Sequence, residues 1–424
     1  MAASAIPGPE NITRQTLGNG ITVLARPNFN SPSITITGYL QVGGLVDPDE
    51  KLGLALFTAA CLTRGTSRRS FQEFHEALEA AGARLGIASG THTTSFHGQA
   101  LAEDLDLLLG SLAEALTQPN FPIEQIERLR TQLLTGLAMR AQDTEEMAGL
   151  ICGRLLFGSH PYSRPGDGYP ETIQAITRQD LSDFHARAYG PRGMIIVVVG
   201  GIDPSLAIER VNAALGGWQN PVQPPPAILP DLIPLNLPVR QDYFIPGKSQ
   251  ADLIAAWIGP TRHSPDYLPA ALGNNILGEF GMMGRIGEVV REKAGLAYSA
   301  QSSFSAGIGP GTWSVDAGVD PVNVNQALDL IQSEVRRFTS EPVSLSELVD
   351  SQDNYIGSLP LSLESNIGVA SALMTLEKYQ LGLDYYLTYA DRIRAVTVEQ
   401  VLETAQRYLD PECMAVAVAG TLVK

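Results

Sequence analysis

The apolar positions of the chain follow two different periods, which predict a mixture of strands and helices. Near the N-terminus, alternation of apolar and polar residues predicts a strand at Leu17–Arg26 with a Gly18-Asn19-Gly20 turn, then a strand at Ile34–Val42. A spacing of three to four residues follows and predicts helices. These are expected at about 51–63, 71–82, 103–117, 123–140, 145–157 and 178–188, ahead of a β-branched strand at 194–199. The pattern indicates an α+β fold.

The same arrangement occurs twice in the sequence. Residues 176–200 and 396–420 carry Thr, Pro, Met and Gly in the same phase, for example Thr177 and Thr397, at a constant offset of 220. In both stretches the threonine is suited to cap a helix, the proline ends the helix, and a β-branched strand follows. We therefore interpret the chain as a duplicated domain.

A proline-rich segment separates the two copies. Seven prolines lie between Gly216 and Pro238. Such a density removes backbone donors and favours an extended, semi-rigid tether. Because the segment also contains apolar residues, part of it is expected to lie against a surface. The predicted organisation is an N-terminal domain at 1–215, a linker at 216–240 and a C-terminal domain at 241–424.

Composition and charge limit the classes of function. With 45 acidic residues against 29 basic ones, the net charge is −16, which argues against nucleic acid and anionic membrane as partners. The three cysteines are too few and too widely spaced for a disulfide framework. No signal peptide is visible at the N-terminus, so a cytoplasmic location is favoured, or a periplasmic one if a leader has been removed.

Residues 49–66 form a predicted helix from which metal ligands are missing. The stretch contains Gly-Leu-Ala-Leu-Phe-Thr-Ala-Ala-Cys-Leu-Thr-Arg-Gly-Thr and resembles the zinc helix of the pitrilysin/insulinase peptidase family, whose usual form is G-L-A-H-F-x-E-H-x-x-x-x-G-T. Leu56 and Ala60 stand where the resemblance places the two histidines, and Ala59 where it places the glutamate. Leucine and alanine have no lone pair to offer a metal.

No other part of the sequence replaces the missing ligands. The resemblance places a third ligand, a glutamate, on the helix after Glu127, but 133–137 read Leu-Leu-Thr-Gly-Leu. His92 and His97 are expected on one strand, and their spacing would put them on opposite faces. We therefore expect this chain to bind no metal and no cofactor of its own.

The second half resembles the family more closely. Residues 291–299 read Arg-Glu-Lys-Ala-Gly-Leu-Ala-Tyr-Ser and are similar to the family's C-terminal signature R-E-K-x-G-L-A-Y-S. The resemblance implies that Arg291 and Tyr298 hold the substrate carbonyl and the developing oxyanion. Guanidinium and phenol are donors suited to that task. A purely structural alternative stays open, in which Arg291 complements the helix dipole and Tyr298 packs in a strand at Leu296–Phe304.

Four glycines precede this signature at intervals of three residues: Gly278, Gly281, Gly284 and Gly287. They form neither a phosphate-binding loop nor a dinucleotide fingerprint, because no Gly-Lys-Ser/Thr follows and the preceding element, Leu268–Leu277, is a predicted helix. The run is similar to the glycine-rich loop of the non-catalytic subunit of mitochondrial processing peptidase, which implies a role in admitting substrate. A simple flexible surface loop is the alternative.

The resemblance extends over about residues 12–422. It implies two duplicated half-domains, each an antiparallel-rich mixed sheet covered by helices. It also implies a non-catalytic, zinc-less subunit of a heterodimeric zinc peptidase that acts on peptides, with zinc in a homologous partner.

Two alternatives stay open at this point. One is a structural scaffold of the same fold without turnover, like the core subunits of respiratory complexes. The other is a free-standing homodimer that binds peptides. Retention of Arg291 and Tyr298 favours the zinc-less subunit over the scaffold, because a scaffold does not need these two side chains.

Overall fold

The computed structural model describes residues 6–282 and 284–421, which form two compact units. Unit 1 contains 1–137, 164–228 and 359–388, and unit 2 contains 138–163, 229–358 and 389–424. Each unit therefore includes a segment from the opposite half of the sequence. The boundaries 1–215, 216–240 and 241–424 describe the duplication along the sequence and stay a prediction.

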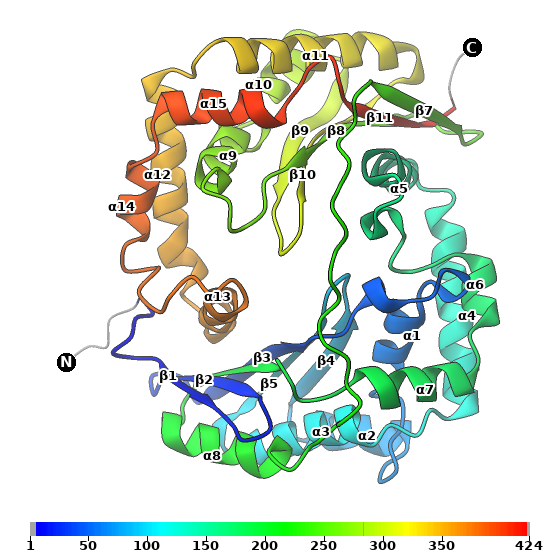
Figure 1. The fold of residues 1–424 in the computed structure, drawn as a ribbon, viewed down its shortest axis with the longest axis vertical. Coiled ribbons are helices and arrows are strands. Elements are labelled where there is room, and N and C mark those ends of the chain that lie inside the picture. The colour runs from blue at the N-terminus through cyan, green and yellow to red at the C-terminus, as the bar shows by residue number, and fades with distance from the viewer. Residues whose placement is uncertain (1–5, 283, 422–424) are drawn as a thin grey trace. The chain divides into compact units, whose positions relative to one another are not determined.

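Unit 1 is built on a mixed sheet with the strand order β1-β2-β6-β3-β5-β4 (Figure 1). Only β2 and β6 run parallel, and the other neighbours are antiparallel. The strands are β1 Thr13–Thr16, β2 Thr22–Pro27, β3 Ser33–Leu40, β4 Arg84–Ser89, β5 Thr94–Leu101 and β6 Ile195–Gly200. The first predicted strand is thus a hairpin of β1 and β2, because the chain reverses at 17–21.

Five helices of unit 1 lie where the periodicity predicts them, and those at 170–175, 204–215 and 366–378 were not predicted. The helices of unit 1 are α1 Leu54–Cys61, α2 Phe71–Ala80, α3 Leu105–Thr117, α4 Ile123–Arg140, α6 Pro170–Ala175, α7 Arg178–Ala188, α8 Pro204–Leu215 and α13 Asn366–Lys378, with single turns η1 Gly44–Val46, η2 Asp49–Lys51 and η3 Ala102–Asp104. The last residues of α4 belong to unit 2. Helix α13, drawn in orange in Figure 1, packs on β3 and β6, so every residue of β6 is buried.

Unit 2 repeats this plan with the order β7-β11-β8-β10-β9. Its strands are β7 Val239–Phe244, β8 Ala251–Gly259, β9 Ala297–Ser305, β10 Gly311–Val319 and β11 Ala415–Gly420. Again one pair, β7 and β11, is parallel and the rest are antiparallel. The last strand of unit 1, β6, lies third from one edge of its sheet, and the last strand of unit 2, β11, lies second from one edge. Each residue of β11 follows its counterpart in β6 by 220 positions in the sequence. The predicted duplication and the antiparallel-rich mixed sheets are confirmed.

The helices of unit 2 cover both faces of its sheet. They are α5 Thr144–Phe157, α9 Tyr267–Asn274, α10 Gly284–Ile286, α11 Val324–Ser340, α12 Leu345–Ser362, α14 Tyr389–Arg394 and α15 Val398–Tyr408, with π-helical η5 Asn275–Glu279 and η6 Gly287–Lys293 and the turns η4 Pro161–Ser163 and η7 Pro321–Asn323. The last residues of α12, from Leu359 on, belong to unit 1. Helix α5 packs on β8 and β11 (Figure 1). Alternate residues of β11 belong to different cores: Ala417 packs with α5, and Val418 packs on the opposite side.

The capping signals of the repeat are realised in both units. Thr177 accepts the N–H of Asp180 at the start of α7, and Thr397 accepts that of Gln400 at the start of α15. The side chain of the third helical residue bonds back to the threonine N–H in both cases, which completes two capping boxes. The sequence repeat therefore specifies the same local structure twice.

The proline-rich segment is extended, as predicted. No helix or strand occurs in residues 219–238, all of which are described. Gln223 anchors its first part to unit 1, donating to the carbonyl of Arg192 at 3.0 Å. Leu232 and Leu235 pack against the core of unit 2 that contains α5.

Candidate functional site

Helix α1 keeps the backbone frame of a zinc helix. It begins after Gly53, whose φ of +93° is left-handed and suits glycine. A side chain there would also meet Ile173 Cδ1 at 2.6 Å and the carbonyl oxygen of Asp167 at 3.0 Å. The predicted helix at 51–63 therefore starts later, at Leu54, because η2 and this glycine precede it.

A buried carboxylate fixes the start of α1. Asp47 accepts the N–H groups of Gly53 and Ala55, each at 3.0 Å. These donors have no partner within the helix, so Asp47 satisfies them. Burial raises the pKa of Asp47 to about 7, while the backbone donors and Arg164 act in the opposite direction.

Three positions of α1 correspond to the two histidines and the glutamate of a zinc helix, and all three carry apolar side chains. Leu56 and Ala60 lie one turn apart and are partly exposed, whereas Ala59 is 1% exposed. Ala55 and Phe57 point into the core of unit 1. The helix therefore keeps its packing face and lacks the side chains that would bind zinc and activate water.

The predicted position of the third ligand is equally apolar. Leu133, Leu134 and Leu137 of α4 pack on the same core as α1, and Thr135 and Gly136 are exposed. Among the described residues, no group of three His, Cys, Asp or Glu side chains is arranged to hold a metal ion. That this chain binds no metal stays a prediction.

One prediction about the histidines is wrong in detail. Strand β5 begins at Thr94, so His97 lies on the strand but His92 precedes it. The reason is a tight turn in which Gly90 donates to the carbonyl of Thr93 at 2.8 Å. His97 is exposed.

Arg291 and Tyr298 both lie in unit 2, on either side of a helix end. Arg291 is in the last turn of η6, where its carbonyl accepts the N–H of Gly295 at 3.0 Å. Gly295 has a φ of +64°, which stops the helix and leads the chain into β9. Arg291 is partly exposed, and Tyr298 is 90% exposed.

The exposure of Tyr298 separates the two readings left open by the sequence. Strand β9 is an edge strand, and Tyr298 projects from it without packing in the core of unit 2. Tyrosine usually buries most of its ring when it serves stability. Tyr298 therefore does not pack in the core of unit 2, and its role in substrate binding stays a prediction.

The four glycines differ in what the backbone requires of them. A side chain on Gly278 would lie 2.3 Å from the Ser302 nitrogen, so this glycine allows η5 to approach β9. Gly284, with φ +61°, would place a Cβ 2.5 Å from the carbonyl oxygen of Ile276. Gly281 has a φ of +64° with open space around it, and Gly287 is buried in η6. Two of the four are thus fixed by close backbone approach.

A polar cluster beneath the glycines was not apparent from the sequence. Ser302 of β9 donates to Asn274 Oδ1 at 2.8 Å, and Asn274 Nδ2 donates to Glu279 at 3.1 Å. These residues line a small cavity of about 280 Å³. The signal that could have indicated it is the Asn-Asn pair at 274–275, since two amides at the end of an apolar helix need partners.

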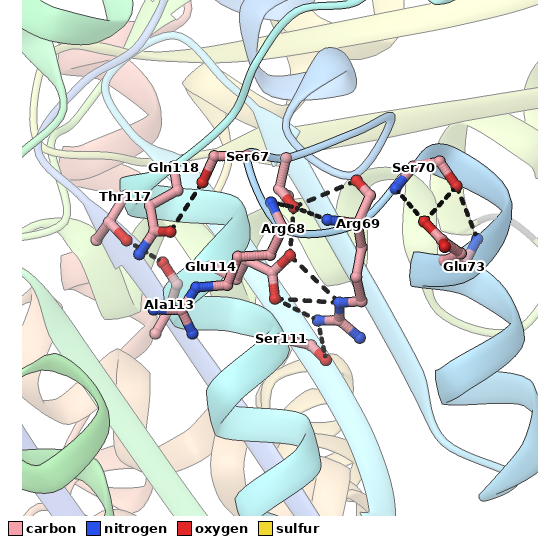
Figure 2. A network of polar contacts seen from close by, with 11 residues as sticks. Ser67, Arg68, Arg69, Ser70, Glu73, Ser111, Ala113, Glu114, Thr117 and Gln118 are labelled. Atoms are coloured by element: carbon pink, nitrogen blue, oxygen red, sulfur yellow. Dashed lines mark hydrogen bonds and ion pairs between the residues drawn. The ribbon is translucent and has the colours of Figure 1, made fainter.

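Each unit also contains a buried glutamate that holds an arginine. In unit 1, Glu114 of α3 bonds Arg69 at 2.8 Å and also accepts from Thr66, which fixes the loop after α1 (Figure 2). In unit 2, Glu334 of α11 lies at the position offset by 220 and bonds Arg337 at 2.7 Å. Burial acts to raise the pKa of Glu114, but the bonds from Arg69 and Thr66 hold that pKa below its ordinary value.

Arg285 joins the unit 2 cluster from α10. It donates to both carboxylate oxygens of Glu347, at 2.7 and 2.8 Å, and lies 3.8 Å from Glu334. This arginine is buried, so the two carboxylates balance its charge. The Arg285 bonds lower the pKa of Glu347 to about 2.

Comparison with known families identifies the class of this protein. Residues 22–148 match the family described as Insulinase (Peptidase family M16), and residues 175–355 match the Peptidase M16 inactive domain. Together with the degenerate helix and the duplicated units, these matches show that the chain belongs to the insulinase peptidase family. Within that family it is a non-catalytic member, since α1 lacks the side chains of a zinc site.

Individual relatives agree with the assignment to this family. An uncharacterized zinc protease of Mycobacterium leprae is 27% identical over 94% of this chain and 89% of its own length. A non-peptidase homolog of Helicobacter pylori is 23% identical over 92% of this chain and 90% of its own length. The crystal structure of a peptidase M16 inactive domain from Pseudomonas fluorescens has a TM-score of 0.90 and 27% identity, covering 97% of this chain and 98% of that one.

Proposed function

We propose that this protein is the zinc-less subunit of a two-chain zinc peptidase that acts on peptides. In this proposal a homologous chain provides the zinc and the general base. This chain provides Arg291 and Tyr298, which donate hydrogen bonds to the substrate carbonyl oxygen as it gains negative charge. The observation that carries the proposal is the 90% exposure of Tyr298 on an edge strand.

The glycine segment supports the same proposal. Gly278 allows η5 to approach β9, the strand that carries Tyr298, and Gly284 allows α10 to approach η5. A Cβ added at Gly281 would meet no other group within 4 Å. In this proposal the four glycines help to admit the substrate to the donors.

Reconstitution with a zinc-bearing homologue tests the proposal. The mixture should hydrolyse peptides, and each chain alone should not. Tyr298→Phe keeps the ring and removes the hydroxyl, and Arg291→Ala removes the guanidinium. Each variant should lower turnover by about 10² to 10³, the usual effect of losing one oxyanion donor.

Two matched variants serve as controls. Tyr243→Phe removes a phenol from β7, the other edge strand of the same sheet. Lys293→Ala removes a neighbouring exposed cation from η6. Both should assemble and turn over at the parental rate, with assembly measured by gel filtration.

A scaffold without turnover is the second candidate, favoured by the similarity to a protein named as a non-peptidase homolog. It predicts that the complex assembles normally and that Tyr298→Phe and Arg291→Ala leave the rate of peptide hydrolysis by the mixture unchanged. That result would reject the shared-site proposal. The absence of any hydrolysis in an assembled mixture with an active partner would do so as well.

A further inference from the structure

The sheets of the two units differ at one edge. In unit 1, β2 runs parallel to the last strand, β6, and its other side is paired with β1 in antiparallel orientation. In unit 2, β7 occupies the equivalent place, because it runs parallel to the last strand, β11 (Figure 1). Among the described residues, no strand pairs with the other side of β7. The repeat therefore leaves one strand position of unit 2 without a described occupant.

The side chains of β7 are more exposed than those of β2. All residues between the two ends of β2 are buried, and α8 packs on that strand. Along β7, exposed residues alternate with partly buried ones, and Phe244 is 61% exposed. Arg240 and Asp242 are also exposed and lie on one face of the strand. An exposed edge strand of this kind is a surface to which another strand can add.

Two hydrogen bonds identify the backbone groups of β7 that face outward. Val239 donates its N–H to the carbonyl of Met414 at 3.1 Å, and Ile245 donates to that of Gly420 at 2.9 Å. In a strand, the N–H and C=O of one residue point to one side, and those of the next residue point to the other side. The odd-numbered residues of β7 therefore face β11. The residues whose backbone groups face the free edge are Arg240, Asp242 and Phe244.

Two of these three residues carry opposite charges. Arg240 donates to both carboxylate oxygens of Asp242, at 2.8 and 3.1 Å, and to the side chain of Asn325 at 2.9 Å. The side chains of Arg240 and Asp242 are 37% and 42% exposed, so both are open to a further ionic partner. A strand that carries a cation and an anion two residues apart is complementary to a second copy of itself in antiparallel orientation, since reversing the strand exchanges the two positions.

Charge selects one register for two antiparallel copies of β7. Outward-facing residues must lie opposite one another to exchange backbone hydrogen bonds. When Gln241 lies on the two-fold axis, Arg240 of each copy lies opposite Asp242 of the other. Moving the axis by one residue in either direction places two Asp242 or two Arg240 side chains opposite each other, which is unfavourable. Pro238, which has no N–H, ends the pairing opposite Phe244.

We propose that a second copy of this chain adds its β7 to the free edge in this register. The two five-stranded sheets would then form one continuous sheet across a two-fold axis. Four side chains of alternating charge would lie along one face at its centre. Because a strand of six residues buries little area, the dimer should be weak, with a Kd on the order of 10 µM.

This surface is separate from the proposed peptidase site. It uses β7, whereas Tyr298 lies on β9 at the other edge of the same sheet. The dimer therefore requires no zinc-bearing partner and is measured with the isolated chain. Failure of the shared-site proposal would leave this measurement unchanged.

Sedimentation equilibrium of the full chain at up to about 500 µM tests the proposal. The wild type should show a reversible equilibrium between monomer and dimer. Arg240→Asp places carboxylates opposite carboxylates, and Asp242→Arg places guanidinium groups opposite one another. Each variant should therefore weaken dimerisation at least about tenfold. An equimolar mixture of the two variants should regain the dimer, because every opposite pair is again of unlike charge.

Two further variants separate the contributions of charge and backbone. Lys293→Asp is the control, because it reverses an exposed charge of the same unit outside β7, and it should leave dimerisation unchanged. Asp242→Pro removes an N–H that faces the free edge and not β11. Proline is tolerated at such positions of edge strands, so this variant should fold and remain monomeric.

Three results would overturn the proposal. They are a wild type that stays monomeric, a dimer that Arg240→Asp does not weaken, and a mixture of the two charge variants that does not regain the dimer. A monomeric wild type whose assembly with a zinc-bearing homologue is lost in Asp242→Pro would assign the free edge to that partner and not to a second copy.

Discussion

The two units share a topology but differ most at one corresponding place. In unit 1, α1 packs beside the edge strand β4 and against α7. In unit 2, α9 and η5 pack beside the edge strand β9 and against α15. The first place carries Leu56, Ala59 and Ala60, and the second carries a polar cluster and the exposed Tyr298.

The side chains at the two places differ in what they contribute to packing. Apolar side chains at α1 satisfy folding without chemistry, since the helix keeps its packing face. Tyr298 adds nothing to the core, and the Asn274–Ser302 cluster must be matched in hydrogen bonds to be tolerated. Core packing accounts for the side chains at the first place, whereas the role of Tyr298 at the second place stays a prediction.

The prediction with the largest expected effect concerns an attempt to make unit 1 catalytic by restoring its zinc motif. Restoring the zinc motif with Leu56→His, Ala59→Glu and Ala60→His together should give no peptide hydrolysis by the chain alone. The third ligand is still missing, because α4 offers only Leu, Thr and Gly at 133–137.

Zinc content of the purified proteins accompanies this assay. The wild-type chain should hold far less than one zinc per chain. Robust hydrolysis by the triple variant, or one chelator-sensitive zinc in the wild type, would contradict the comparison.

The buried glutamates offer a comparison at equivalent positions. Glu114→Gln leaves Arg69 without its carboxylate and should lower the free energy of unfolding by about 3 kcal/mol. Glu334→Gln should cost only about 1 kcal/mol, because the Arg337 side chain that Glu334 bonds is 45% exposed and Arg285 retains its two bonds to Glu347. Urea unfolding measures both, with exposed Glu403→Gln as the control. Equal costs would contradict this difference between the two clusters.

Two glycines of unit 2 should differ in their cost. Gly284→Ala meets both a left-handed φ and a backbone oxygen at 2.5 Å, and should destabilise by more than about 2 kcal/mol. Gly281→Ala has the same backbone strain but open space, so about 1 kcal/mol is expected. Thermal unfolding of the two variants distinguishes them, and a larger cost at Gly281 would contradict the geometry.

The smallest expected effects are on the pH dependence of stability. As pH rises, the contribution of Asp47 in unit 1 should fall, and that of Glu347 in unit 2 should increase. The folded-state pKa of Asp47, about 7, lies above its ordinary value of 3.8, so this group makes stability fall as pH rises between these values. The folded-state pKa of Glu347, about 2, lies below its ordinary value of 4.5, so its contribution is lost as pH falls from about 4.5 to 2.

Difference curves isolate these contributions. The unfolding free energy of Asp47→Asn, minus that of the wild type, should rise between about pH 4 and 7. The same difference for Glu347→Gln should be flat above pH 4.5 and change only below it. A slope of the same sign in both windows would show that one assignment is wrong.

Periodicity predicted most of the helices in the first half of the chain and the repeat, because those signals are local. Thr177 and Thr397 identified helix starts since a cap depends on only three neighbouring residues. Strand β4 escaped prediction because its apolar residues are few and Gly86 interrupts them. The boundary of α1 was displaced by Gly53, whose left-handed conformation depends on Asp47 and Ile173.

The sequence predicted only those residues of the candidate site that belong to a recognisable motif. Arg291 and Tyr298 were assigned only through the resemblance to the family's C-terminal signature, and the exposure of Tyr298 depends on β9 being an edge strand. The Asn274–Ser302 bond joins residues 28 positions apart, and the π-helices place them together. Such long-range contacts have no signature in a single sequence. The roles of all these residues in turnover stay predictions.

The exchange of helices between the two units constrains the order in which the protein can be built. Helix α13 covers one face of the sheet of unit 1, but it is translated after residue 365. Helix α5 is made early, and the strands β8 and β11 that it covers are made later. A nascent chain therefore exposes apolar surfaces through most of its synthesis, and cutting the gene at the linker would separate each sheet from a helix that covers it.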